Sequence, residues 1–381
     1  MSRNIDQRLS SLQARRTGTD TRSFERLGFE AKLEVLAKSL AFEPWQRRAA
    51  SQPHTRYALG AMQAVSTEYT RISVETANRV GKQLENRLSM PVEFRLQGSV
   101  PLDVHIRGVS DVDLLVLDTN FLTYALYGPG SLAGQYRGPP AQRGSLDVLK
   151  SLRSEAEKAL KIAYPAADVD CSGGKCIALS GGSLARPVDV VPSHWWDTFE
   201  YQAKRQEKDR GVTILNKKIP ETTDNLPFLH IDRIDTRDQI VIGGLKKAIR
   251  LAKNVKNDAE NEAGAAQLPS FDIAGLLYHA DQATLRSGYF YELAILLETQ
   301  RFFDWCYQNP TAARALRTPD DRRNILDTDA KFAGLRTISC ELDKLARAVT
   351  REQLPILGQA SDPSWLQIDD TLRKVLVPAA P

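Results

Sequence analysis

Residues 96–118 read LQGSVPLDVHIRGVSDVDLLVLD, and this stretch decides how the rest of the sequence is interpreted. A Gly-Ser pair at 98–99 is followed, after eleven intervening residues, by two aspartates separated by one valine. Because side chains alternate along a strand, Asp111 and Asp113 are expected on one face and Val112 on the other. Two carboxylates on one face repel each other, so the pattern predicts either a solvated strand end or a cation between them.

Neither half of this pattern is specific by itself. A second Asp-Val-Asp occurs at 168–170, and Gly-Ser occurs four times, at 98, 130, 144 and 182. Only at 98 does the pair precede two aspartates at this spacing, and there an aliphatic run follows them. A solvated, turn-capping aspartate pair is the structural alternative. In the functional interpretation, Gly98 lets backbone amides approach a phosphate, Ser99 adds a hydroxyl donor, and the aspartates bind Mg²⁺.

A third carboxylate belongs to residues 186–196, RPVDVVPSHWW, which predict a strand ended by Pro192. Asp189 lies between valines, where an aspartate is costly to bury unless it is paired or binds a metal. Two-metal phosphoryl or nucleotidyl transfer uses such a third carboxylate, because one ion can then activate the attacking hydroxyl. The alternative is an edge-strand aspartate that pairs with Arg186 or another arginine.

The composition is that of an ordinary folded protein, with 42% hydrophobic and 26% charged residues in a chain of 381, long enough for two lobes. No apolar stretch approaches the roughly 18 residues that cross a bilayer, and the polar start lacks the apolar segment of a secretory signal, so we expect a cytoplasmic protein without membrane association. The net charge of +4 is too weak to indicate a dedicated duplex-binding protein. Four cysteines without a CxxC pair or a histidine cluster indicate reduced thiols.

The pattern of apolar residues predicts an α+β architecture with a first, sheet-containing lobe. Residues 1–22 are polar and predict a poorly packed tail, and a catalytic lobe is expected over 23–237. In that lobe helical patterns occur at about 23–50, and one long helix of about nine turns is predicted over 55–89. Strands and a helix over 146–164 follow it.

The remaining segments predict a hairpin, a crossover and a helical lobe. Gly173 and Gly174 are expected at the turn of a hairpin, and the chain after Asp209 is expected to form short strands and an extended crossover. Residues 238–381 predict a second lobe made of helices, interrupted by a linker at about 258–268.

The combination of these motifs resembles a known group. The Gly-Ser pair at 98–99, Asp111-Val-Asp113, and Asp189 within VDVVPSHWW match the hG[GS], [DE]h[DE]h and h[DE]h signature of polymerase-β-like nucleotidyltransferases. The length, the long helix before the motif and the helical second lobe look most like the bacterial cGAS/DncV-like nucleotidyltransferases, from about residue 55 to 300. The resemblance implies a polymerase-β-like core, built from a mixed sheet, helices and a long spine helix, with a helical lobe that closes a nucleotide cleft.

The resemblance also implies roles for individual residues. Asp111, Asp113 and Asp189 would be catalytic and would hold two Mg²⁺ ions, with Mn²⁺ as an alternative metal. The nucleotide-binding residues that it implies are Gln97, Gly98, Ser99, Lys253, Ser270 and Phe271.

Two helical stretches carry the last three of these roles. LKKAIRLAKNVKN is similar to the family helix whose lysine reaches the triphosphate, which makes Lys253 the candidate, with Lys246 or Lys247 behind it. LPSFDIAGLLYH is similar to a family Ser-Tyr or Ser-Phe pair, in which the serine contacts the triphosphate and the ring stacks on the base, as Ser270 and Phe271 would. The alternatives are a solvated lysine face and a phenylalanine that anchors the next helix in the core.

The activity that the resemblance implies is template-independent nucleotidyl transfer. A ribose hydroxyl attacks an α-phosphate, pyrophosphate leaves, and a second round closes a cyclic dinucleotide from substrates such as ATP and GTP. In bacteria such products are second messengers of anti-phage defence, read by a separate effector protein. The alternatives are nucleotidyl transfer to an RNA 3′ end, a protein or a small molecule, and a non-catalytic nucleotide or RNA sensor. The bases and the linkage stay open at this stage.

Overall fold

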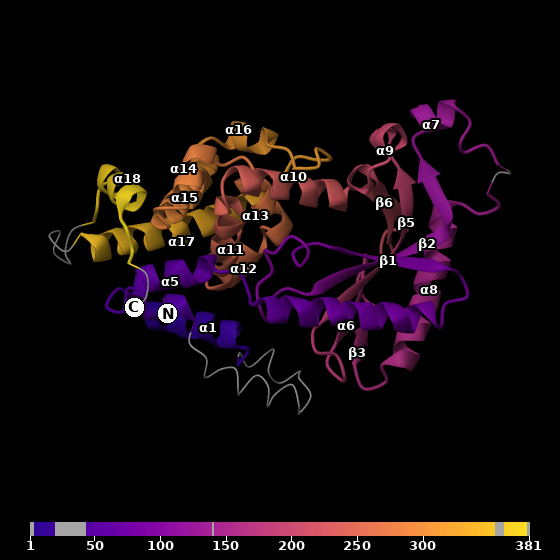
Figure 1. Cartoon of the computed structure of the whole chain (residues 1–381), viewed down its shortest axis with the longest axis horizontal. Helices are drawn as coiled ribbons and strands as arrows, with labels where there is room; N and C mark the ends of the chain where they lie inside the picture. The colour runs from indigo at the N-terminus through magenta and orange to yellow at the C-terminus, as the bar shows by residue number, and fades with distance from the viewer. Residues whose placement is uncertain (1–3, 20–42, 139–140, 355–361, 379–381) are drawn as a thin grey trace.

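The computed structural model describes residues 4–19, 43–138, 141–354 and 362–378. Figure 1 shows an elongated molecule with two lobes, one built around a β-sheet and one built from helices. Helix α1 (Ile5–Thr17) packs on the helical lobe, and Val377 and Pro378 also lie there, because their carbonyls accept hydrogen bonds from Arg48. Among the described helices, none is both long and apolar enough to cross a membrane.

The sheet has seven strands in the order β1-β2-β5-β4-β3, with β6 paired to β5 and β7 to β6. Strands β2 and β5 are parallel, and every other pair is antiparallel, so the mixed sheet expected from the sequence is present. The strands are β1 (Val92–Gln97), β2 (Val112–Tyr124), β3 (Asp168–Asp170), β4 (Ile177–Ser180), β5 (Val188–Asp197), β6 (Gly211–Asn216) and β7 (Glu221–Asn225).

Strand β2 separates two hydrophobic cores, as its aliphatic run predicted. Val112, Leu114 and Val116 pack with residues of α6 and α8 on one face. Leu115 and Leu117 pack on the other face against the central strand β5 and β6. Because side chains alternate along a strand, Asp113 lies on the second face, away from α6 and α8.

Most helices of the sheet lobe cover one face of the sheet or connect its strands. These helices are α6 (Thr67–Glu85), α7 (Pro129–Leu132), α8 (Ser145–Ala163), α9 (Phe199–Lys204) and the 3₁₀ turn η1 (Glu207–Asp209). Helix α10 (Pro227–Ile240) runs from the sheet lobe to the helical lobe, as Figure 1 shows.

The helical lobe has its own hydrophobic core, which also includes residues from the start of the chain. Its helices are α1 (Ile5–Thr17), α4 (Pro44–Arg47), α5 (Pro53–Met62), α11 (Gly244–Asn257), α12 (Glu262–Ala266), α13 (Ser270–Leu277), α14 (Gln282–Ser287), α15 (Leu293–Gln308), α16 (Pro310–Ala315), α17 (Asp329–Gln353) and α18 (Trp365–Lys374).

The single long helix predicted over 55–89 is wrong, because two helices occupy this stretch. Helix α5 ends at Met62 and α6 begins at Thr67, where the Ser66 hydroxyl accepts a hydrogen bond from the Tyr69 amide (3.2 Å) and caps the second helix. The break lets α5 pack in the helical lobe while α6 packs on the sheet. Apolar periodicity continues through both segments, so periodicity alone could not locate it.

The poorly packed tail expected over 1–22 is also wrong for its described residues. Asn4 begins helix α1 with a capping box, and Leu9 and Leu12 are buried in the helical lobe. Arg15 forms a two-pronged ion pair with buried Asp258 (2.7 and 2.6 Å). Most of the helical pattern expected at about 23–50 lies outside the described residues.

Three further boundaries differ from the sequence expectations. Strand β5 continues past Pro192 to Asp197, because Pro192 falls between the residues that pair with β4 and those that pair with β6. The expected crossover becomes helix α10 from Pro227, so the lobe boundary expected at 237/238 falls inside a helix. The expected linker contains helix α12, which buries Ala265.

The anchoring of α1 gives a stability prediction. Arg15→Ala removes the arginine partner of the fully buried Asp258 carboxylate, which also accepts the Tyr57 hydroxyl (2.7 Å), and should lower the free energy of unfolding by about 3 kcal/mol in urea denaturation. The matched control is Lys374→Ala, which removes an exposed ion pair with Asp370 and should change the same quantity by less than about 1 kcal/mol. Equal effects of the two substitutions would show that α1 is not anchored in this way.

Candidate active site

The Gly-Ser turn lies against Asp113, the carboxylate on strand β2. Gly98 follows β1 in the left-handed region (φ +77°), and a Cβ built on it would lie 2.1 Å from Oδ2 of Asp113. Gln97 pairs with Asp113 across β1 and β2, and the Ser99 carbonyl accepts the amide of Val104 (3.0 Å). A glycine is therefore required at 98 both by the backbone conformation and by the carboxylate against it.

Asp113 and Asp189 are neighbours on the sheet. They are paired in the register of the parallel strands β2 and β5, so their side chains lie on the same face. Burial, together with the neighbouring carboxylates of Asp189 and Asp111, raises the pKa of Asp113 from 3.8 to about 7, and Lys253 opposes the shift. Burial also raises the pKa of Asp189, although a hydrogen bond with the Cys176 thiol lowers it.

Asp111 completes the trio of carboxylates, and it lies on the exposed segment just before β2. Across the described residues, no three histidine, cysteine, aspartate or glutamate side chains are grouped closely enough to hold a metal on their own. The carboxylates nevertheless fit a hard divalent cation, because Asp113 is crowded by like charge that such an ion would relieve. Mg²⁺ is usually held by one or two carboxylates together with substrate phosphates, which agrees with an incomplete protein ligand set.

Helix α11 of the helical lobe donates hydrogen bonds to the loop between Ser99 and Asp111. The buried Arg250 side chain donates to the carbonyls of Met62 (2.8 Å) and Asp103 (2.7 Å). The buried Lys253 ammonium donates to the carbonyl of Val104 (2.6 Å). Burial, helped by Lys256 and Arg250, lowers the pKa of Lys253 to about 8, and Asp113 opposes this shift. The helical lobe therefore places a lysine within electrostatic range of the carboxylates.

Lys246 and Lys247 lie on the same helix but are engaged elsewhere. Lys246 pairs with Asp235 (2.7 Å) and Lys247 approaches Glu292 (3.8 Å). Of the three candidate lysines, the structure brings only Lys253 to the carboxylates.

The expected Ser-Phe pair begins helix α13. Ser270 is exposed, and Phe271 is 41% exposed. One face of the Phe271 ring stacks on the imidazole of His230 from α10, with 4.2 Å between ring centroids. His230 is buried, and burial together with Arg323 lowers its pKa to about 4, so the imidazole is neutral near pH 7.

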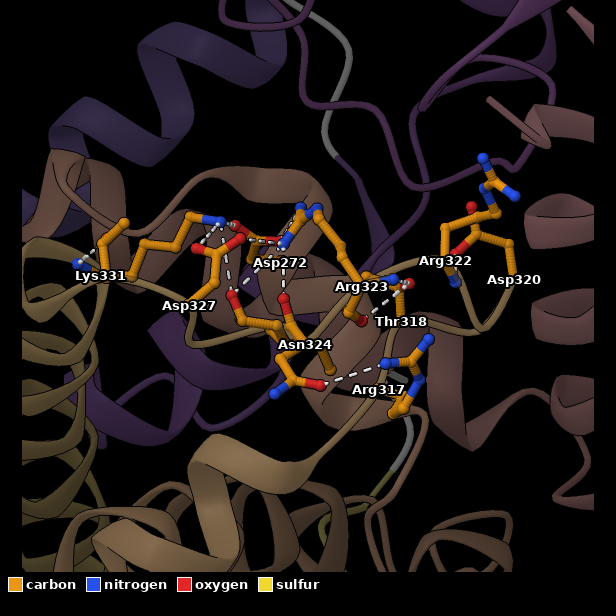
Figure 2. A network of polar contacts seen from close by, with 11 residues as sticks. Asp272, Arg317, Thr318, Asp320, Arg322, Arg323, Asn324, Asp327 and Lys331 are labelled. Carbon is orange, nitrogen blue, oxygen red and sulfur yellow. Dashed lines mark hydrogen bonds and ion pairs between the residues drawn. The ribbon is translucent and has the colours of Figure 1, made fainter. Parts of the chain in front are cut away.

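The segment between α16 and α17 carries residues that the sequence analysis did not identify. Figure 2 shows its polar network around Asp272, the fully buried carboxylate next to Phe271. Arg323 and Lys331 both pair with Asp272, the latter at 3.0 Å. Arg322 reaches the sheet lobe, where its guanidinium carbon lies 4.9 Å from the centroid of the Trp196 ring. The only available sequence signal was the cluster of arginines at 317, 322 and 323.

Comparisons with known proteins identify the family of the chain. The C-terminal helical domain of cGAS/DncV-like nucleotidyltransferases matches residues 232–336. A cyclic dinucleotide synthase, CdnE of Yersinia aleksiciae, is 41% identical over 363 residues, which are 95% of this chain and 93% of that protein. The chain belongs to the cGAS/DncV-like nucleotidyltransferase family. A c-di-GMP synthase of a Lachnospiraceae bacterium (strain RUG226) is 31% identical over 67% of this chain and 77% of that protein.

Solved structures of family members have the same fold. The STING-associated CdnE c-di-GMP synthase of Flavobacteriaceae sp. matches 91% of this chain and 98% of its own with a TM-score of 0.69 at 22% identity. The corresponding synthase of Capnocytophaga granulosa matches 90% of this chain and 97% of its own with a TM-score of 0.67 at 25% identity. The nucleotidyltransferase core and helical lobe that the resemblance implied are therefore confirmed.

The Gly98 turn of this nucleotidyltransferase gives a second prediction. Gly98→Ala should destabilise the protein more than Gly243→Ala in urea denaturation, and by well over the 1–2 kcal/mol or so of left-handed strain alone. The control glycine has the same left-handed backbone (φ +82°), but nothing lies within 4 Å of its added Cβ. The additional loss of unfolding free energy in Gly98→Ala thus measures the steric clash between the added Cβ and Asp113. Equal losses would mean that the carboxylate moves away freely.

The pKa of Asp113 predicts how stability depends on pH. The pKa of Asp113 is higher in the folded than in the unfolded protein, so at a pH between the two values folding takes up a proton. Its contribution to the free energy of unfolding therefore becomes unfavourable as pH rises from about 4 to about 7. Asp113→Asn should therefore be more stable than the wild type at pH 8 without divalent metal, on the order of 4 kcal/mol, and the difference should vanish near pH 4.

Calorimetric melting from pH 4 to 8 checks this expectation, with Asp168→Asn on exposed strand β3 as the control. A difference between wild type and Asp113→Asn that does not change with pH would contradict it.

Proposed function

We propose that this chain condenses ribonucleoside triphosphates into a cyclic dinucleotide. The observation that carries the proposal is the approach of Lys253, from the helical lobe, to the crowded face of Asp113 and Asp189 on the sheet. A triphosphate with bound metal ions complements the charges of this arrangement. Its anionic phosphates attract the lysine, and the cations attract the carboxylates. The names of the curated family members support a cyclic dinucleotide as the product.

Each side chain has a definite task in this proposal. Asp111, Asp113 and Asp189 would hold the Mg²⁺ ions, or Mn²⁺ in their place. When bound, the metal ions neutralise phosphate charge and lower the pKa of the attacking hydroxyl. Lys253 binds the triphosphate, and the Gly98-Ser99 turn offers backbone amides and a hydroxyl to its oxygens. Catalysis then rests on positioning and charge neutralisation, without a covalent enzyme intermediate.

The base of one nucleotide would stack on the exposed part of the Phe271 ring. One face of that ring is held by His230, which fixes its orientation. A neutral imidazole and a phenyl ring together form a platform that accepts any base by stacking. Ser270, at the start of the same helix and exposed, would contact the triphosphate beside Lys253.

The biological role that we propose follows from the family. Solved family members hold nucleotides or their analogues, including GTP with Apcpp in a CdnE of Elizabethkingia meningoseptica. We propose ATP and GTP as the substrates to test first, and a separate effector protein as the reader of the product in bacterial anti-phage signalling. No nucleic-acid template is required by this mechanism, and we place the reaction in the cytoplasm.

The test is incubation of the purified chain with labelled ATP, GTP, CTP and UTP, singly and in pairs, with Mg²⁺. The expected product resists phosphatase, and its mass is that of a cyclic dinucleotide. Asp113→Asn and Asp189→Asn should each reduce its rate of formation by at least about 100-fold, because each removes a ligand of the ions. Asp168→Asn, in the second Asp-Val-Asp, should retain the full rate, and removal of divalent metal with EDTA should abolish product.

Three results would contradict the proposal. Product that requires added RNA or protein would indicate nucleotidyl transfer to that acceptor. Nucleotide binding without pyrophosphate release under any pairing would indicate a sensor. Near-normal turnover by Asp113→Asn or Asp189→Asn would remove that carboxylate from the site.

A further inference from the structure

The guanidinium of Arg323 is fixed beside the proposed base platform. Its carbon lies 5.6 Å from the centroid of the Phe271 ring. Nη2 pairs with the buried carboxylate of Asp272, while Nη1 donates to the carbonyls of Asn324 (3.0 Å) and Ile325 (3.3 Å) and approaches Asp327 (3.4 Å). Figure 2 shows these contacts from close by. The planar group therefore has one orientation, set by several partners at once.

The segment that carries Arg323 is itself held on both sides. Within it, the amide of Thr318 donates to the carbonyl of Arg323 (2.9 Å), which closes a short turn. Arg233 of α10 donates to the carbonyl of Pro319. Arg322 lies over Trp196 of β5, so the turn contacts both lobes. A side chain on such a support loses little further freedom when a ligand binds, which favours selective recognition.

One edge of the guanidinium remains available. The contacts with Asp272, Asn324, Ile325 and Asp327 engage the two Nη atoms, and no described residue accepts a hydrogen bond from Nε. The Arg323 side chain is 37% exposed, so solvent or a ligand can reach it. An arginine has donors only, and a planar edge with two N–H groups pairs best with two adjacent acceptors.

Lys256 connects the helix that carries Lys253 with the segment before the platform. Lys256 follows Lys253 on α11, and it donates to the carbonyl of Leu268 (2.7 Å), just before α13. The same lysine is within electrostatic range of both Lys253 and Asp272. A nucleotide with its phosphates at Lys253 and its base on Phe271 would thus present a base edge to Arg323.

We propose that Arg323 is a specificity-determining residue that selects guanine on this platform, by donating hydrogen bonds to N7 and O6. Guanine is the base that offers two adjacent acceptors on its Hoogsteen edge, whereas adenine has a donor beside N7 and a pyrimidine lacks N7 altogether. This inference rests on the proposed nucleotidyl transfer, and it adds the identity of one base.

The test compares GTP with 7-deaza-GTP, which lacks only the N7 acceptor, in the wild type and in Arg323→Lys. Lysine keeps the positive charge next to Asp272 but loses the planar pair of donors. We expect kcat/KM of the wild type, measured by pyrophosphate release with Mg²⁺, to be roughly tenfold lower for 7-deaza-GTP. In Arg323→Lys the two nucleotides should differ by less than about twofold, because the partner of N7 is gone.

A matched control separates this effect from damage to the turn. Arg317→Lys changes another arginine of the same segment, which pairs with exposed Asp321, and it should keep the wild-type ratio between the two nucleotides. Melting temperatures of all three proteins show whether they fold. The wild-type comparison needs no substitution, so it holds even if Arg323→Lys is unstable.

Each outcome decides the inference. It is overturned if the wild type uses both nucleotides equally, if the penalty for 7-deaza-GTP persists in Arg323→Lys, or if product forms only from nucleotides other than GTP. Absence of product from every nucleotide is a different result, because it contradicts the proposed function itself.

Discussion

The crowding of Asp113 is the constraint on which the rest of the site depends. Its carboxylate lies against Gly98 on one side and beside the in-register Asp189 on the other. This arrangement is unfavourable without a ligand, since burial raises the pKa of both carboxylates and repulsion raises that of Asp113 further, which reduces stability. In the proposed function, bound cations would relieve this repulsion, so that binding would offset the unfavourable energy of the empty folded site.

The site also depends on contacts between the two lobes. The loop from Ser99 to Asp111 is gripped by α11, through Arg250 and Lys253, while Leu102 and Val104 from the same loop join the core of the helical lobe. A single helix therefore fixes both this loop and Lys253, the two parts of the site to which we assign the phosphates. At the other end of the site, the turn that holds Arg323 makes a similar bridge through Arg322 and Trp196.

The sequence predicted the placement of the carboxylates better than the elements that support them. The alternation around Asp113 and Asp189 is local, and the parallel register of β2 and β5 then places them side by side. The break at Ser66 was missed because apolar periodicity continues across it, although the two helices pack in different cores. Arg323 was missed because its role depends on Asp272, 51 residues earlier in the chain, and such a contact leaves no local pattern.

The central claim is that the carboxylates form an incomplete metal site that a nucleotide triphosphate completes. The most direct measurement is titration of the purified protein with Mn²⁺, followed by electron paramagnetic resonance, with and without a non-hydrolysable GTP analogue. The account predicts weak binding of Mn²⁺ to the protein alone, and binding at least about tenfold tighter when the analogue is present, beyond its affinity for the free analogue. Equal affinity with and without the analogue would contradict it.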